Sequence, residues 1–323
     1  MTIVENAVRR IEEGGSIGRE EALALYEAPL EELCRAADEL REKYCADGFD
    51  LCTIVNGKSG HCSENCKFCA QSGFHHTQIK EYPLLSEDEI VEGAQYNRDQ
   101  GVVRYSIVTS GKRLSDPELD QMIKAVRRIG EEVDISVCAS FGLLNVDQFR
   151  RLKEAGVSRI HNNLETSERN FPNICTTHSF ADKVAAIRAA QEAGLAVCSG
   201  GIMGLGETVE DRIDMALSLR ELGIKSVPIN RLNPIPGTPF ADNEPLTDDD
   251  MRRIVAIYRF ILPDAAIRLA GGRGLFVDKG KGCFQSGANA AISGDMLTTA
   301  GITVETDLAM LDELGYEVRL CDD

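Results

Sequence analysis

Short β-rich runs alternate with amphipathic helical runs from about residue 50 towards the end of the chain. We expect strands at 51–55, 102–109, 134–141, 158–165, 196–203, 226–232, 265–270 and 288–293. We expect helices between them at 86–100, 116–129, 146–155, 180–193, 209–222 and 248–261. This order predicts parallel strands, and eight strand-then-helix units fit an α/β fold, a closed (β/α)8 barrel of the TIM type. A doubly wound open sheet is the alternative.

Glycines follow several of the expected helices and suit helix ends. They are Gly101, Gly130, Gly156, Gly194 and Gly223. Residues 1–48 read as helical, since apolar residues recur at spacings of three and four in 20–27 and 30–44. We therefore predict an N-terminal helical extension, 1–48, that caps one end of the barrel, followed by a barrel domain at 49–323.

Composition excludes some classes of partner. The formal charge of −17 on 323 residues argues against nucleic acid and anionic membranes. The chain has no run of 18 apolar residues and no secretory signal, so we expect a cytoplasmic protein without a membrane span. Eleven cysteines in such a chain indicate metal binding or catalysis rather than disulfides.

Three cysteines, Cys62, Cys66 and Cys69, fall within eight residues at the spacing C-x3-C-x2-C. Three thiolates can hold a [4Fe–4S] cluster and leave one of its irons open to a small molecule. Zinc, which takes four ligands, is the alternative, with His61 as a fourth candidate. The offset spacing and the lack of a second cysteine pair nearby favour the iron–sulfur site.

Alternation of side chains along the expected strands turns many polar groups towards the barrel interior. The inward set is Arg104, Ser106, Cys138, His161, Asn163, Glu165, Cys198, Asn230 and Arg268. Buried polar groups are costly without partners, so the sequence predicts a large enclosed site. The glycine-rich run at 200–206 would allow a ligand to approach the backbone closely, although glycines alone are weak support. Cys34, Cys45, Cys52 and Cys321 are interpreted as packing or surface thiols.

The cysteine motif resembles the signature of the radical S-adenosylmethionine (SAM) superfamily. With it, five segments resemble the biotin synthase family in order along nearly the whole chain. They read CSENCKFCAQS, VCSGGIMGLGET, VPINRLNPIPGTP, IRLAGGR and GANAAISGDMLTT. The signature specifies only the superfamily, whereas the five segments together specify the family.

The resemblance implies an activity. Cys62, Cys66 and Cys69 would hold a [4Fe–4S] cluster whose open iron binds SAM, and one electron would cleave SAM to a 5′-deoxyadenosyl radical. That radical would abstract hydrogen from dethiobiotin, and sulfur from an auxiliary iron–sulfur cluster would close the ring of biotin. An enclosed barrel would shield the radical from solvent. The resemblance also implies a homodimer and an electron donor such as flavodoxin or ferredoxin.

The resemblance implies roles for individual residues as well. Asn163, Glu165 and Lys183 would contact SAM, with Glu165 in place of the usual aspartate and Lys183 in place of an arginine. The substrate-binding set would be His161, Asn230, Thr298 and Thr299, with His161 in place of an asparagine.

Cys138, Cys198 and Arg268 match three of the four ligands of the auxiliary cluster. The fourth position, a cysteine in the family, is Ser106 here. Three hypotheses follow. Ser106 ligates a [2Fe–2S] cluster, another thiol such as Cys175 or Cys283 completes a different cluster such as a four-iron variant, or the auxiliary site is lost.

Two other classes compete with sulfur insertion. One is another barrel enzyme of the superfamily, such as a methylornithine synthase or a hydrogenase maturase, which needs no sacrificial sulfide. The other is an iron–sulfur electron carrier, which has no use for a roomy polar interior.

Overall fold

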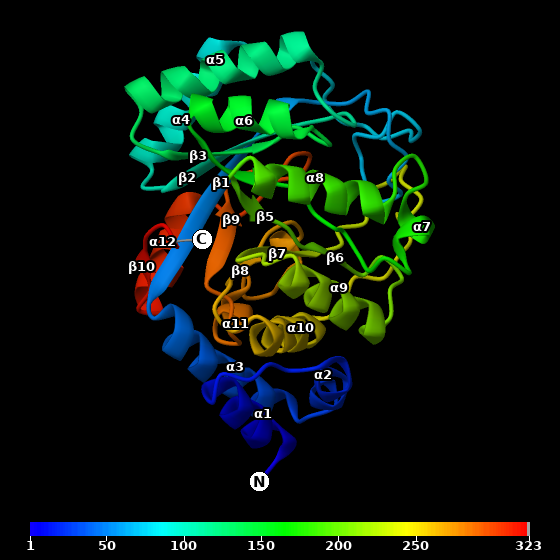
Figure 1. The fold of residues 1–323 in the computed structure, drawn as a ribbon, viewed down its shortest axis with the longest axis vertical. Coiled ribbons are helices and arrows are strands. Elements are labelled where there is room, and N and C mark those ends of the chain that lie inside the picture. Colours follow the sequence, from blue (N-terminus) through cyan, green and yellow to red (C-terminus); the bar gives the residue numbers. More distant parts are fainter. Residues whose placement is uncertain (322–323) are drawn as a thin grey trace.

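The computed structural model describes residues 1–321 and contains a closed barrel of parallel strands surrounded by helices (Figure 1). The sheet runs in the order β10-β1-β2-β3-β4-β5-β7-β8-β9, and β1 also pairs with β9, which closes the barrel. The strands are β1 (Gly48–Lys58), β2 (Arg104–Thr109), β3 (Ser136–Ser140), β4 (Val157–His161), β5 (Ala196–Cys198), β6 (Gly201–Met203), β7 (Ser226–Arg231), β8 (Ala266–Leu269), β9 (Ala290–Ser293) and β10 (Glu317–Val318). The predicted (β/α)8 barrel is confirmed.

One expected strand is divided in two. The run predicted at 196–203 forms β5 and β6 with a break at Ser199 and Gly200, and both pieces pair with β7. A Cβ atom on Gly200 would lie 1.9 Å from the carbonyl oxygen of Pro228, so the break depends on glycine. β10 is a short addition that pairs with the start of β1.

The helices of the outer layer begin where hydrogen-bonding side chains cap them. They are α4 (Glu87–Asp99), α5 (Asp116–Glu132), α6 (Val146–Ala155), α8 (Phe180–Glu192), α9 (Val209–Glu221) and α10 (Asp248–Ile261). Each of these six starts with a capping box, in which a Ser, Thr or Asn side chain and the residue three positions later satisfy each other's backbone N–H groups. Such caps typically stabilise a helix by about 1 kcal/mol.

The glycine positions divide into two kinds. Gly156 caps α6 in the left-handed conformation, and Gly101, Gly194 and Gly223 also have positive φ just past a helix. Gly130 lies inside α5, which continues to Glu132, so the helix end predicted there is wrong. The shorter elements are α7 (Phe171–Ile174), η1 (Arg273–Leu275), α11 (Lys281–Phe284) and α12 (Val304–Glu313).

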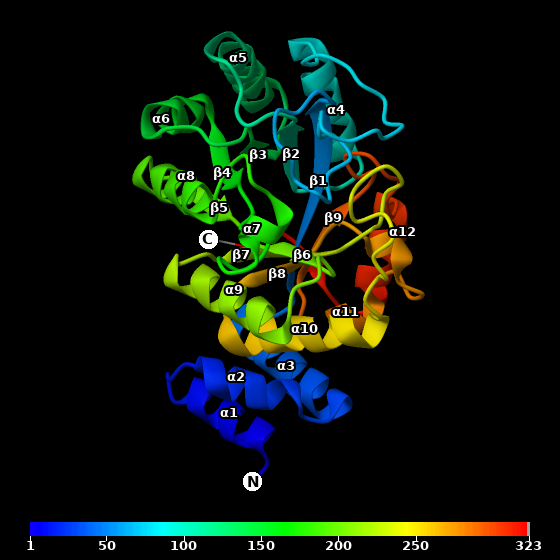
Figure 2. The same ribbon diagram turned by 90° about the vertical axis from the view of Figure 1, so that its right-hand side faces the viewer.

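The N-terminal segment is helical, as expected. It contains α1 (Ile3–Glu12), α2 (Arg19–Tyr26) and α3 (Leu30–Cys45). These helices contact α9 and α10 of the outer layer, where the blue end of the ribbon lies beside them in both views (Figures 1 and 2). The extension therefore packs against the outer helices, and its description as a cap over a barrel end stays a prediction. The division into domains at 1–48 and 49–323 stays a prediction.

Candidate radical SAM active site

A cavity of about 400 Å³ occupies the interior and mouth of the barrel. The thiols of Cys62, Cys66 and Cys69 line it near the loop that follows β1. Cys138 and Cys198, from β3 and β5, line the same cavity with Arg268 from β8. Two sets of thiols that lie far apart in the sequence therefore face one enclosed space.

The loop that carries the first set folds back on itself. The backbone N–H of Cys62 donates to the carbonyl of Gln71 (3.1 Å), and the N–H of Gly73 donates to the carbonyl of Cys62 (2.8 Å). The N–H of Lys67 donates to the carbonyl of Ile174 at the end of α7 (2.9 Å). These bonds fix the loop, so its three thiols suit a [4Fe–4S] cluster with one open iron.

His61 does not join this set. Its imidazole is 81% exposed and lies 3.0 Å from the Glu81 carboxylate, beside the loop. The zinc alternative therefore loses the fourth ligand considered for it.

The SAM-binding prediction falls on a row of polar residues after β4. Asn163 accepts a hydrogen bond from the N–H of Gly200 (3.1 Å) and donates to the Glu165 carboxylate (3.3 Å). Glu165 has φ of 72°, a strained conformation for a residue other than glycine, and a Cβ atom on Gly201 would lie 2.4 Å from its carbonyl oxygen. Strain held by close backbone packing fits a ligand-binding position.

Alternation from His161 would turn Asn162 away from the interior, but Asn162 also lines the cavity because β4 ends at His161. Its side-chain oxygen accepts a hydrogen bond from the Lys183 ammonium at 3.2 Å. Lys183 is thereby held at the cavity, although it comes from α8 in the outer layer.

Replacing Lys183 with methionine is expected to raise the KM or Kd for SAM about tenfold, since a charge-assisted hydrogen bond contributes about 1.5–3 kcal/mol. Equilibrium binding of SAM to the reconstituted protein measures this effect. The Lys183→Arg variant keeps the charge and should bind as the parent does. If the methionine variant bound SAM with the affinity of the parent chain, Lys183 would not contact SAM.

The residues predicted to read the substrate all line the cavity. The Asn230 amide donates to the carbonyl of Gly201 (2.9 Å) and accepts from the N–H of Gly271 (2.8 Å), so part of its hydrogen-bonding capacity is used by the backbone. His161 lies against the Cys198 thiol, which ties it to the second set of thiols as well. Thr298 and Thr299 lie in the turn after β9.

A buried carboxylate, Asp50, lies beneath the second set of thiols with three arginines around it. Arg104 donates to it from Nη2 at 3.0 Å, Arg268 Nη2 lies 2.9 Å away, and Arg159 Nη1 lies 3.4 Å away. Although burial opposes it, the charges of these three arginines hold the pKa of Asp50 well below its usual range. Guanidinium groups therefore gather beneath the second set of thiols, and their positive charge suits anionic thiolate ligands.

This positive charge acts on the thiols. Burial raises the pKa of Cys198, but a hydrogen bond with His161 and the charges of Arg268 and Arg159 outweigh it and bring the value down to about 7. For Cys138, burial raises the pKa and outweighs the opposing charges of Arg104 and Arg159. Arg104 Nη1 lies 3.7 Å from Cys138 Sγ.

Cys52 belongs to this group, although the sequence interpretation made it a packing thiol. It lines the cavity from β1 and is 5% exposed. Burial raises its pKa to about 12, while Arg268 and Arg104 act in the opposite direction and the Cys138 thiol lies near enough to interact with it. Asp50, Cys52 and Ile54 share one face of β1 by simple alternation, so this periodicity could have revealed it.

The two thiols suggested as replacements for the missing cysteine lie elsewhere. Cys283 is buried in the apolar core beside Phe284 and does not line the cavity. Cys175 lies 3.7 Å from Cys66, so it accompanies the first set of thiols and not the second. The hydrogen bond between these thiols raises the pKa of Cys66 and lowers that of Cys175. Ser106 does line the cavity, and its β2 position pairs with Cys138.

Comparison with known proteins agrees with this geometry. The Radical SAM superfamily description matches residues 56–219, and the Biotin and Thiamin Synthesis associated domain matches 228–317. A biotin synthase of Akkermansia muciniphila is 59% identical over 99% of this chain and 100% of its own length. The chain belongs to the biotin synthase family. A biotin synthase of Brachyspira hyodysenteriae is also 59% identical, over 97% of this chain and 94% of the relative.

Solved structures of other proteins are similar to this family member in their fold. A methylornithine synthase superposes with a TM-score of 0.84 at 19% identity, covering 99% of this chain and 98% of that one. An FeFe-hydrogenase maturase of Carboxydothermus hydrogenoformans gives 0.83 at 18% identity, covering 99% and 80%. Within residues 1–321, no helix has the length and apolar character needed to cross a membrane.

Proposed function

We propose that this chain converts dethiobiotin to biotin by radical SAM sulfur insertion. The observation that carries the proposal is the single cavity lined by Cys62, Cys66 and Cys69 and also by Cys138, Cys198 and Arg268. An enzyme that only cleaves SAM has no need of a second set of buried thiols. Membership of the biotin synthase family supports the same reaction.

The chain's residues divide the work between two ends of the cavity. Cys62, Cys66 and Cys69 would hold the [4Fe–4S] cluster, which supplies the one-electron cleavage of SAM. Asn163, Glu165 and Lys183 would bind and orient SAM beside it. The barrel wall around the cavity would limit the access of water to this chemistry.

At the other end, we propose that Cys52, Cys138, Cys198 and Arg268 hold the auxiliary cluster. Arg268 lies near enough to Cys52 and Cys198 to interact electrostatically with both, and Cys52 lies near enough to Cys138 to interact with it. Cys52 thus restores the third thiol that Ser106 removes from the family pattern. The guanidinium groups beneath these residues would stabilise an anionic cluster.

The auxiliary iron content tests the role of Cys52. In a Cys62→Ala background, which should keep only the auxiliary cluster, the Cys52→Ala variant is expected to lose more than about half of its iron after reconstitution. Ser106→Ala is the matched control and should keep its iron. Mössbauer spectra of the background also distinguish a [2Fe–2S] cluster from a four-iron cluster. If the Ser106→Ala variant lost iron and the Cys52→Ala variant kept it, Ser106 would be the ligand in place of Cys52.

Dethiobiotin would lie between the two ends, against His161, Asn230, Thr298 and Thr299. The amide of Asn230 keeps one N–H and part of its oxygen free after its two backbone hydrogen bonds, enough for one face of a ureido ring. His161, which is hydrogen-bonded to Cys198, would also hold that cysteine in position as a ligand of the auxiliary cluster.

The reaction is tested with reconstituted protein, dethiobiotin, SAM and a reductant under anaerobic conditions. We expect biotin together with 5′-deoxyadenosine and methionine. Cleavage of SAM without biotin would favour an enzyme of the methylornithine synthase or hydrogenase maturase kind. Iron and sulfide content separates them independently, since that kind should hold about four irons and this chain clearly more.

A flavodoxin or ferredoxin as electron donor, a homodimeric assembly and a cytoplasmic location remain part of the proposal. They are supported by resemblance to the family alone.

A further inference from the structure

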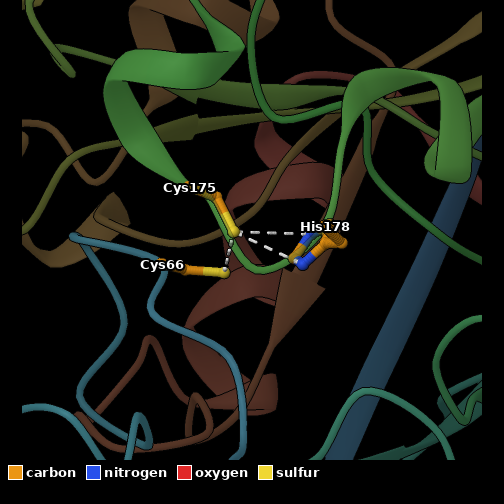
Figure 3. Close-up of side chains that lie close together, drawn as sticks. All are labelled: Cys66, Cys175 and His178. Carbon is orange, nitrogen blue, oxygen red and sulfur yellow. Dashed lines mark hydrogen bonds between the residues drawn. The ribbon is translucent and has the colours of Figure 1, made fainter.

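Beside the loop of the first set of thiols lies a group of side chains that the proposed reaction does not use. Cys175 and His178 come from the segment after α7 and point towards Cys66 (Figure 3). Cys66 Sγ and Cys175 Sγ are 3.7 Å apart. Cys175 Sγ is 3.3 Å from His178 Nδ1 and 3.8 Å from Nε2, and one ligand atom from each residue lies within 4.8 Å of the others.

These separations match the edges of a tetrahedral metal site. Two sulfurs bound to one zinc at about 2.3 Å are about 3.8 Å apart, and a sulfur and a nitrogen are about 3.5 Å apart. Cysteines that ligate different irons of one cluster lie farther apart, because each bonds its own iron. Cys66 and Cys175 are therefore placed for one shared ion and not for neighbouring irons.

A second layer of side chains holds the histidine in place. The Glu64 carboxylate lies 2.6 Å from His178 Nδ1, and both side chains are buried, at 8% and 6% exposure. A carboxylate bonded to one ring nitrogen is the usual support of a metal-binding histidine, and it leaves Nε2 free to bind the ion.

The thiol is held as well. The side-chain oxygen of Asn65 accepts hydrogen bonds from the backbone N–H groups of Thr176 (2.9 Å) and Thr177 (3.3 Å). The same oxygen lies 3.5 Å from Cys175 Sγ. The turn that carries Cys175 is thus fixed against the cysteine loop without any ion.

We propose that Cys66, Cys175 and His178 form a site for one thiophilic divalent cation, Zn²⁺ or Fe²⁺, in the full-length chain before its cluster is assembled. Binding would release thiol protons to solvent and leave a fourth position for water. Cys66 cannot serve this ion and the cluster at once, so the two states exclude each other. That competition rests on the proposed role of Cys66 in the SAM-binding cluster. Binding of the ion itself does not depend on that proposed role.

The first test uses Co²⁺ with the full chain freed of clusters under anaerobic conditions. We expect thiolate-to-cobalt charge transfer and the strong d–d bands of a tetrahedral site. Cys175→Ala and His178→Ala should each lower the Co²⁺ stoichiometry by one and remove these bands. Cys283→Ala is the matched control, because Cys283 is buried in the apolar core and belongs to neither set of thiols. Glu64→Gln should weaken binding about 10- to 100-fold, with the fold intact by circular dichroism.

The second test measures competition. One equivalent of Zn²⁺ added before iron and sulfide should slow formation of the [4Fe–4S] absorbance in the parent chain at least severalfold. The Cys175→Ser variant should escape this effect. Cobalt bands that survive the loss of Cys175 and His178 but vanish with Cys62 and Cys69 would overturn the site. Neither the cobalt bands nor the rate of cluster formation depends on biotin formation. A failure of the ion site can therefore be told apart from a failure of the sulfur-insertion proposal.

Discussion

Replacing Cys198 with alanine should lower biotin formation more than about 100-fold while reductive cleavage of SAM continues. Cys198 lies at the inner set of thiols, where Arg268 and Arg159 lower its pKa, and it is remote in the chain from the loop that carries Cys62, Cys66 and Cys69. Its loss would remove a proposed ligand of the auxiliary cluster and would leave in place the three thiols proposed for the SAM-binding cluster. The measurement is biotin and 5′-deoxyadenosine from the same anaerobic reaction.

Cys283→Ala is the control for this experiment, since Cys283 is equally buried but lies in the apolar core outside the cavity. It should keep both products apart from a modest loss of stability. Equal loss of biotin and 5′-deoxyadenosine in the Cys198 variant would mean that the inner thiols are not a separate site.

Replacing Asp50 with alanine should lower the free energy of unfolding by about 3–5 kcal/mol, the usual cost of breaking a buried ion pair. The carboxylate is fully buried, and its removal takes away the acidic group that Arg104 and Arg268 contact in the barrel interior. Chemical denaturation of the cluster-free chain measures the change.

An exposed ion pair provides the comparison. Asp264 contacts Lys225 with both side chains about half exposed, so Asp264→Ala should cost less than about 1 kcal/mol. If Asp50→Ala were equally mild, the carboxylate would not be what neutralises the arginines of the barrel interior.

The barrel could be predicted from the sequence because local signals repeat along it. The six helices α4, α5, α6, α8, α9 and α10 each start at a capping residue such as Ser86 or Thr247, and the strands between are rich in apolar residues. Gly130 shows the limit of such signals: a glycine followed by Glu131 and Glu132 resembles a helix end, yet the helix continues through it.

The site was predictable where it lies along single strands. Ser106, Cys138, Cys198 and Arg268 face inward as alternation requires. Cys52 was missed because the alternation of the first strand was not followed, although Asp50 and Cys52 share its inner face. The partner of Cys175 could not be read from the sequence, since a contact between two loops over a hundred residues apart leaves no periodic pattern.

The most direct test of the account follows the sulfur atom. The chain is reconstituted with ³⁴S-sulfide, freed of unbound sulfide, and given dethiobiotin, SAM and reductant for a single turnover. If sulfur comes from the auxiliary cluster, mass spectrometry should find ³⁴S in nearly all of the biotin formed, with loss of the auxiliary-cluster spectrum. Biotin without the label, or 5′-deoxyadenosine without biotin, would contradict the account.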